Sequence, residues 1–214
     1  MIETGFIEFR EKKVEMSFYS HSEYISNTLR GGHFCEEELL GYILDNYPDN
    51  TGMLDVGANI GNHSVFFANF LKLQNIYAFE PHPMNFELLK HNTERYPNIK
   101  IFNFALGEKD RTGNLINEAH NMGGAFIVAG NMVEIKPFDS LGISNISFVN
   151  IDVEGFESFV LQGMSHLLEN EHPVIFLEAT GAERLSSVLY VLDKYSYEMK
   201  IKFWDNMYLF EVWE

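Results

Sequence analysis

The sequence has little of what several classes of protein need. It contains one cysteine, Cys35, so no internal disulfide and no cysteine-based zinc site can form. No apolar run approaches the ~20 residues of a membrane-spanning helix, and the first residues lack the basic and apolar regions of a secretion signal. H-E-x-x-H and EF-hand patterns are also missing. We therefore expect a soluble, cytoplasmic protein that uses no metal.

Basic residues are scarce as well. The chain has 15 Lys and Arg against 31 Asp and Glu, which gives a formal net charge of −16. Nucleic acids and anionic membranes are usually bound by clustered Lys and Arg. The composition therefore predicts neither a nucleic-acid nor a membrane partner. Most of the acidic residues keep the protein soluble, but they would also favour a positively charged ligand.

A third absence concerns the glycines of the most informative motif. The run Asp55-Val-Gly57-Ala58-Asn59-Ile-Gly61 follows an apolar segment, yet it does not match the G-x-G-x-x-G pattern that binds the pyrophosphate of a dinucleotide. Glycines in such a turn still let a ligand approach the backbone. Glu80 ends the next apolar segment, where ribose hydroxyls would need an acceptor. The pattern indicates a nucleoside cofactor without phosphates.

Apolar runs and helical periodicity alternate from residue 53 onward. The predicted strands are 53–56, 76–79, 99–106, 147–151 and 174–177, and the predicted helices are 62–73, 83–95, 154–168 and 182–194. Segments 197–203 and 207–212 flank Trp204-Asp205-Asn206 as a closing hairpin. This order predicts an α/β fold with a doubly wound, mostly parallel sheet and an antiparallel C-terminal hairpin. Residues 107–137 are less regular, with a short strand at 132–136.

A chain of 214 residues is most simply one domain. We expect residues 1–48 to form an N-terminal extension, with a small hairpin over 6–18 and a helix over 36–46. Residues 49–214 then form the core. Ligands of doubly wound sheets bind beyond the carboxyl ends of the strands. This rule directs attention to four segments: 55–63, 80–82, 103–107 and 152–157.

Those segments resemble the FkbM family of S-adenosylmethionine-dependent methyltransferases. The likeness covers roughly residues 31–180 and is carried by four motifs: Asp55-Val-Gly-Ala-Asn-Ile-Gly-Asn-His-Ser64, Ala78-Phe-Glu-Pro81, Phe104-Ala-Leu-Gly107 and Ile151-Asp-Val-Glu-Gly-Phe-Glu157. The resemblance implies a Rossmann-like sheet of seven strands, S-adenosyl-L-methionine as cofactor, and O-methylation of a hydroxyl on a small molecule or saccharide. Asn150 stands where members of that family often carry Lys.

The resemblance also implies roles for single residues. Asp55, Gly57, Asn59 and Gly61 would line the methionine side of the cofactor, Glu80 would bind the ribose, and Asp152 and Glu154 would face the reacting centre. The predicted cofactor-binding residues are Asp55, Gly57, Ala58, Asn59, Gly61, Glu80, Pro81, Asn103, Ala105 and Asp152. The predicted catalytic residues are Asp152, Glu154 and His63, because a hydroxyl nucleophile must lose a proton to a carboxylate or an imidazole.

Each of these residues also has a structural explanation. Acids after a strand can cap the next helix, and acids in a first helical turn are stabilised by its dipole by ~0.3–1 kcal/mol each. On that basis Glu157 is predicted to be a solvated cap. His63 could be a general base near neutral pH or a polar first-turn residue that faces solvent.

Two other functions remain open at this point. A nicotinamide-dependent oxidoreductase would share the sheet and the acid at Glu80, and a non-catalytic module could bind a nucleoside cofactor without turnover. The identity of the methyl acceptor is expected to depend on residues 1–30 and 108–131. The sequence leaves the oligomeric state open.

Overall fold

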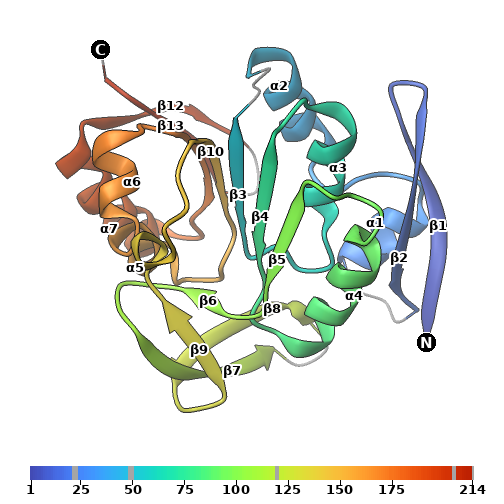
Figure 1. The fold of residues 1–214 in the computed structure, drawn as a ribbon, viewed down its shortest axis with the longest axis horizontal. Helices are drawn as coiled ribbons and strands as arrows, with labels where there is room; N and C mark the ends of the chain where they lie inside the picture. Colours follow the sequence, from blue (N-terminus) through green and yellow to red (C-terminus); the bar gives the residue numbers. More distant parts are fainter. Residues whose placement is uncertain (21–23, 48–50, 119–120, 204–205, 214) are drawn as a thin grey trace.

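A computed structural model describes residues 1–20, 24–47, 51–118, 121–203 and 206–213. Its main sheet has seven strands in the order β12-β13-β11-β10-β3-β4-β5 (Figure 1). Strands β11, β10, β3, β4 and β5 are parallel, whereas β13 pairs antiparallel with both β11 and β12. The predicted fold class is confirmed. The strands are β3 (Gly52–Val56), β4 (Asn75–Phe79), β5 (Ile99–Phe102), β10 (Ile146–Ile151), β11 (Val174–Glu178), β12 (Tyr197–Lys202) and β13 (Met207–Val212).

Helices cover both faces of this sheet (Figure 1). The first group is α1 (Tyr24–Arg30), α2 (Glu37–Asn46), α3 (Asn62–Phe70) and α4 (Pro83–Thr93), and the second is α5 (Glu157–Gln162), α6 (Ser165–Asn170) and α7 (Ala182–Leu192). Two short 3₁₀ helices span Phe138–Leu141 and Asp193–Tyr195. Neighbouring strand residues face opposite sides, so Met53 and Phe148 join the core on one side while Leu54 and Val149 join the core on the other. Among the described residues, no helix combines the length and apolarity that crossing a membrane would require.

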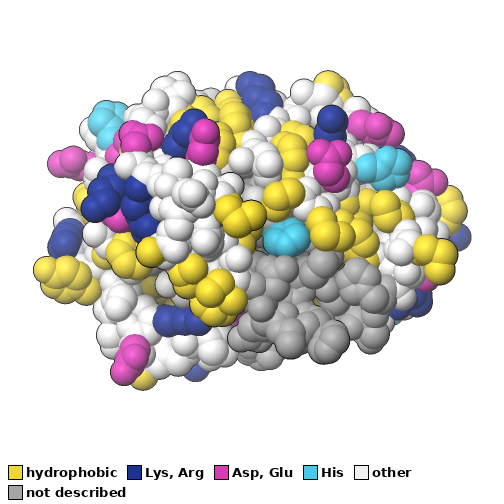
Figure 2. Space-filling model, turned by 90° about the horizontal axis from the view of Figure 1, so that it is seen from below, with side chains coloured by type: hydrophobic (Ala, Val, Ile, Leu, Met, Phe, Trp, Pro, Cys, Tyr) yellow, Lys and Arg dark blue, Asp and Glu magenta, His cyan; other side chains and the backbone are white. Residues whose placement is uncertain are grey.

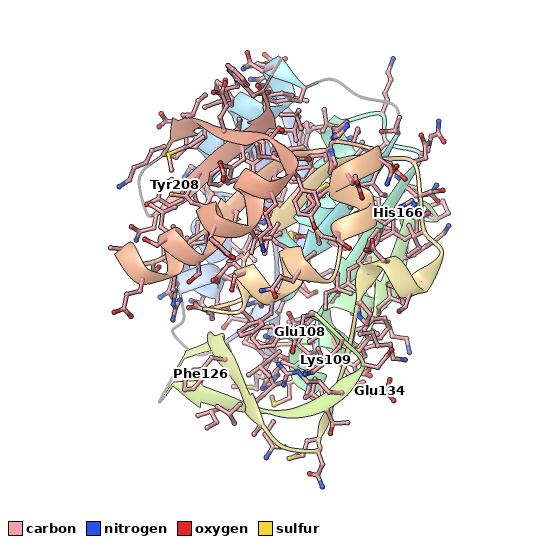
Figure 3. All side chains as sticks on the ribbon, turned by 90° about the vertical axis from the view of Figure 1, so that its left-hand side faces the viewer. Glu108, Lys109, Phe126, Glu134, His166 and Tyr208 are labelled. Atoms are coloured by element: carbon pink, nitrogen blue, oxygen red, sulfur yellow. The ribbon has the colours of Figure 1, made fainter. Side chains whose placement is uncertain are left out.

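A second sheet covers the carboxyl ends of the main strands (Figure 1). Its order is β6-β9-β7-β8, with β6 at Ala105–Leu106, β7 at Arg111–Glu118, β8 at Asn121–Ala129 and β9 at Val133–Lys136. Figure 3 views it with Phe126 on β8 at one side, Glu134 on β9 at the other, and Glu108 with Lys109 between. The sequence indicated only short, irregular strands here, so this sheet is more regular than expected.

Two predicted elements are broken in the structure. The strand expected over 99–106 ends at Phe102, because Asn103 Nδ2 turns to donate to the carbonyls of Glu80 (2.9 Å) and Pro81 (3.3 Å). The helix expected over 154–168 is divided into α5 and α6. It begins late because Gly155 has a φ of 95°, and it breaks at Gly163, where a Cβ would lie 1.9 Å from the carbonyl oxygen of Gly107.

The N-terminal residues form an antiparallel hairpin, β1 (Ile2–Phe9) and β2 (Lys12–Tyr19), which is longer than predicted. It packs on the main unit through Asn92 of α4, whose side chain accepts from the Ser17 amide (2.8 Å) and donates to the Ser17 carbonyl (2.9 Å). The predicted C-terminal hairpin is confirmed as β12 and β13, although Trp204 and Asp205 of its expected turn lie outside the described residues. The division at residue 48 stays a prediction.

Candidate functional site

A hollow of about 590 Å³, partly open to solvent, lies where the main sheet meets the smaller one. The carboxyl ends of β3, β4 and β10 form its floor, and Leu115 of β7 with Ile127 of β8 closes it from the other side. Of the residues predicted for cofactor and catalysis, those that line it are Gly57, Asn59, Glu80, Pro81, Ala105, Asp152 and Glu154. Figure 2 shows the molecule from below, with hydrophobic side chains near the middle of this face and most charged ones toward its edge.

Glu80 is fixed in the hollow by backbone amides. Its Oε2 accepts from the Asn59 N–H and its Oε1 from the His82 N–H, both at 2.8 Å. The side chain is buried, and this burial raises the pKa of Glu80 to about 7 despite the two amides. Each carboxylate oxygen has a further lone pair. The carboxylate can therefore accept two hydrogen bonds from neighbouring hydroxyls of a ligand.

The glycine turn is shaped by contacts within the protein. Gly57 has a φ of 88°, and a Cβ there would lie 1.8 Å from the carbonyl oxygen of Asp152. The amides of Gly57 and Ala58 both donate to the Phe79 carbonyl, at 2.9 and 3.0 Å. Asn59 has a φ of 50°. A side chain at position 57 would thus push apart the two strand ends that form the floor of the hollow.

Four of the predicted cofactor-binding residues do not line the hollow. Ala58 is buried, and Gly61 packs on α4, where a Cβ would lie 3.0 Å from a Leu89 methyl group. Asn103 supports the chain at Glu80 through the two hydrogen bonds described above. Asp55 is fully buried: its Oδ2 accepts from Ser64 Oγ (2.5 Å) and its Oδ1 from Asn150 Nδ2 (3.1 Å). A direct contact between any of these four and a cofactor stays a prediction.

His63 does not face solvent. Glu36 Oε2 lies 2.9 Å from His63 Nε2, so the two side chains form an ion pair when the imidazole is protonated. Asn150 Nδ2 lies 3.1 Å from Nδ1. Burial lowers the pKa of His63, but the hydrogen-bonding and charge effects of Glu36 outweigh it, so that the pKa is raised overall. Glu36 was not predicted as a site residue, because nothing in its local sequence marks it.

Three carboxylates converge beside the hollow. Oxygens of Asp152, Glu154 and Glu178, the acid cluster, lie within 4.8 Å of one another. Burial and then the nearby charge of Glu178 hold the pKa of Asp152 well above its usual range. Arg184 Nη1 lies 3.8 Å from Glu154. Among the described residues, this cluster is close enough to share one divalent cation; the expectation that no metal is used stays a prediction. The rule that ligands bind beyond the carboxyl ends of the strands, here called the strand-end rule, would have identified Glu178 if it had been applied to β11.

Glu157 corrects one sequence-based expectation. It is 2% exposed rather than solvated, and its Oε1 accepts from the Gly155 N–H at 2.6 Å. The left-handed backbone at Glu154 and Gly155 turns that amide toward the start of α5. Glu157 therefore stabilises the loop that carries Glu154.

The family model for the methyltransferase FkbM domain matches residues 55–199. The hexuronic acid methyltransferase AglP of Haloferax volcanii is 27% identical over 154 residues, which cover 65% of this chain and 61% of that protein. The structure of methyltransferase FkbM from Methylobacillus flagellatus aligns with a TM-score of 0.55 at 20% identity, over 75% of this chain and 43% of that one. M. jannaschii TYW2 in complex with AdoMet aligns with a TM-score of 0.50 at 13% identity, over 97% and 83%. The chain spans less than two thirds of the first two relatives, and the two structures show a shared fold.

Proposed function

Because the chain belongs to the methyltransferase FkbM domain family, we propose that it transfers a methyl group from S-adenosylmethionine to a hydroxyl of a small molecule or saccharide. The observation that carries the proposal is Glu80, a buried carboxylate held by two amides at the wall of the hollow. That arrangement fits the two hydroxyls of a ribose.

The chemistry of the lining supports a cofactor without phosphates. Among the described residues that line the hollow there is no Lys or Arg, whereas a pyrophosphate is usually met by cations or by a helix N-terminus with a G-x-G-x-x-G turn. When bound, S-adenosylmethionine supplies an electrophilic methyl group on a positively charged sulfonium. The carboxylates of Asp152 and Glu154 supply negative charge to the same hollow.

Asp152 is the residue we assign to proton transfer. Bound S-adenosylmethionine would supply the methyl group: the acceptor oxygen would form the new bond to the methyl carbon, and the sulfur would keep the electron pair of the broken carbon–sulfur bond. The hydroxyl proton then passes to the Asp152 carboxylate. Burial and the charge of Glu178 raise the pKa of Asp152, which makes it a better base than an exposed aspartate.

A saccharide acceptor is supported by the relative named hexuronic acid methyltransferase. We propose a small acceptor rather than a nucleic acid because the net charge of −16 opposes a phosphate backbone.

Two measurements test the proposal. S-adenosylhomocysteine at 100 times its Kd is expected to stabilise the protein by about 2.7 kcal/mol in thermal unfolding, and NAD is expected to have no effect. Label from a methyl-labelled donor should then appear on a sugar or other small hydroxyl compound, and not on RNA. Stabilisation by NAD alone would refute the cofactor. Tight donor binding without transfer to any acceptor would favour a binding module.

A further inference from the structure

The short segment before α2 is attached to the first turn of α3. The Cys35 amide donates to Asn62 Oδ1 at 3.0 Å, and Asn62 Nδ2 donates back to the Cys35 carbonyl at 3.3 Å. Both residues are buried. This pair of hydrogen bonds places Glu36, the next residue, beside His63 of the same helical turn.

Glu36 adopts an unusual conformation for its position. Its φ of 59° and ψ of 34° are left-handed, and its side chain makes no capping hydrogen bond to α2. A left-handed conformation is unfavourable for a residue with a Cβ. The carboxylate instead forms the ion pair with His63, with the two side chains only 21% and 14% exposed. Desolvating both charges is also unfavourable. Neither the start of the helix nor stability explains this arrangement.

The other ring nitrogen of His63, Nδ1, contacts the side-chain amide of Asn150. Asn150 Nδ2 lies 3.1 Å from Asp55 Oδ1 and 3.1 Å from His63 Nδ1. An ionised Asp55 can only accept, so the Asn150 amide group must turn its N–H bonds toward both atoms. In the neutral ring, His63 Nδ1 then accepts, which assigns the single ring proton to Nε2, the atom that faces Glu36. Ser64 Oγ donates to the second oxygen of Asp55.

Glu36, His63, Asn150, Asp55 and Ser64 thus form a buried polar chain. It connects the segment before α2 with α3, the end of β10 and the end of β3. Asn150 lies two residues before Asp152, and Asp55 lies two residues before Gly57. The polar chain therefore supports the two strand ends that carry the glycine turn and Asp152, the proposed base.

We propose that Glu36 is a positioning residue for methyl transfer, which acts through His63 and Asn150 on the floor of the hollow. This inference rests on the proposed function. Glu36 lies outside the residues matched by the family model, 55–199, so it is a contribution of the N-terminal segment. His63 is a positioning residue too: both ring nitrogens contact protein groups, and it does not line the hollow.

The directions of the two pKa shifts agree with the contact between Glu36 and His63. Burial raises the pKa of Glu36, but His63 lowers it by more, so the net direction is down. Burial lowers the pKa of His63, and Glu36, with a smaller effect from Asp55, raises it overall. The charge of Glu36 also contributes to the raised pKa of Asp152, together with Glu178 and Glu154.

Glu36→Gln is the informative variant, with Glu38→Gln as its control. Glu38 is an exposed acid two residues away, so the control makes the same change in charge. We expect Glu36→Gln to lower kcat by roughly 10- to 100-fold, because small displacements at a reacting centre are costly. The KM for S-adenosylmethionine should stay within about threefold, since Glu80 and its two amides remain in place. The pKa of His63, followed by NMR, should fall. Glu38→Gln should behave as the wild type.

His63→Gln and the double variant complete the test. If the two residues act as one unit, the double variant should be no slower than the slower single variant. A wild-type kcat and an unchanged His63 titration in Glu36→Gln would overturn the proposal. So would an NMR spectrum of the wild-type protein that places the neutral ring proton on Nδ1, which requires no variant to fold. Because the NMR measurements need no acceptor, failure of the proposed transfer reaction and failure of this inference are distinguishable.

Discussion

Glu80 and Asp152 line the same hollow, yet the protein surrounds them in different ways. Glu80 accepts from two backbone N–H groups that are already in position. Asp152 is faced by Glu178 and Glu154, which are charges of its own sign. The first arrangement holds a carboxylate ready to bind hydroxyl groups, and the second keeps a carboxylate ready to take up a proton. The comparison teaches that the groups around a carboxylate, and not the residue type, set whether it is suited to bind hydroxyl groups or to take up a proton.

The largest effect is expected from Asp152→Asn, which removes the proposed acceptor of the proton. We expect kcat to fall by about 10²- to 10⁴-fold, while the affinity for S-adenosylhomocysteine changes little. Steady-state kinetics and calorimetric titration measure the two quantities. Asp110→Asn, at an exposed position, is the control. An active Asp152→Asn variant would remove the distinction between the two acids.

Gly57→Ala tests the close approach of the Gly57 backbone to the carbonyl group of Asp152. The new Cβ would meet the Asp152 carbonyl at 1.8 Å, whereas a Cβ at Gly142, which also has a positive φ of 65°, would have nothing within 4 Å. Gly142→Ala should therefore cost about 1–2 kcal/mol of unfolding free energy from conformation alone. Gly57→Ala should cost about 2–5 kcal/mol, because a steric displacement is added. Equal losses in denaturant unfolding would contradict the close approach.

Glu80→Gln should affect binding and leave the acid cluster intact. Hydrogen bonds to a charged group contribute about 1.5–3 kcal/mol, so we expect S-adenosylhomocysteine to bind roughly 10- to 100-fold more weakly. Glu87→Gln changes the same charge at an exposed position of α4 and should have no effect. Unchanged affinity in Glu80→Gln would show that the ribose lies elsewhere.

A change of pH is expected to have a smaller effect on the affinity for S-adenosylhomocysteine. Burial raises the pKa of Glu80 to about 7, and the ionised form is the acceptor that hydroxyls need. Affinity for S-adenosylhomocysteine should therefore rise by about tenfold from pH 6 to pH 8. Glu80→Gln should remove this dependence. In the protein without ligand, the free energy of unfolding should instead fall as pH rises. The raised pKa of Glu80 stabilises the folded state at low pH, and this contribution is lost between the ordinary pKa of 4.5 and about 7.

Much of the main sheet could be predicted from the sequence, because β3, β4, β10 and β11 are short apolar runs that end in polar residues. The strand-end rule also located most of the hollow, including Glu80 and Asp152. The breaks could not be predicted. They arise where the Asn103 side chain finds two carbonyls and where Gly163 meets the backbone of Gly107. Both depend on contacts between distant segments.

The same limit applies to single site residues. The sequence predicts Asp55 as a ligand contact because it lies at the end of a strand. In the structure, its carboxylate oxygens accept hydrogen bonds from Ser64 and Asn150. In the sequence, Glu36 is an ordinary acidic residue before a predicted helix. Its contact with His63 is formed only in the folded chain. Local patterns indicate where a strand ends, whereas the partners of a buried polar group are set by tertiary structure.

The position of β13 has a consequence for the order of assembly. Its residues, Met207–Val212, are inserted between β11 and β12 and hydrogen-bond to both. During synthesis on the ribosome, β11 and β12 therefore emerge before the strand that separates them, and each exposes an unpaired edge until it arrives. Removing those six positions would delete an interior strand of the sheet and leave two open edges on a nascent chain that is prone to aggregate.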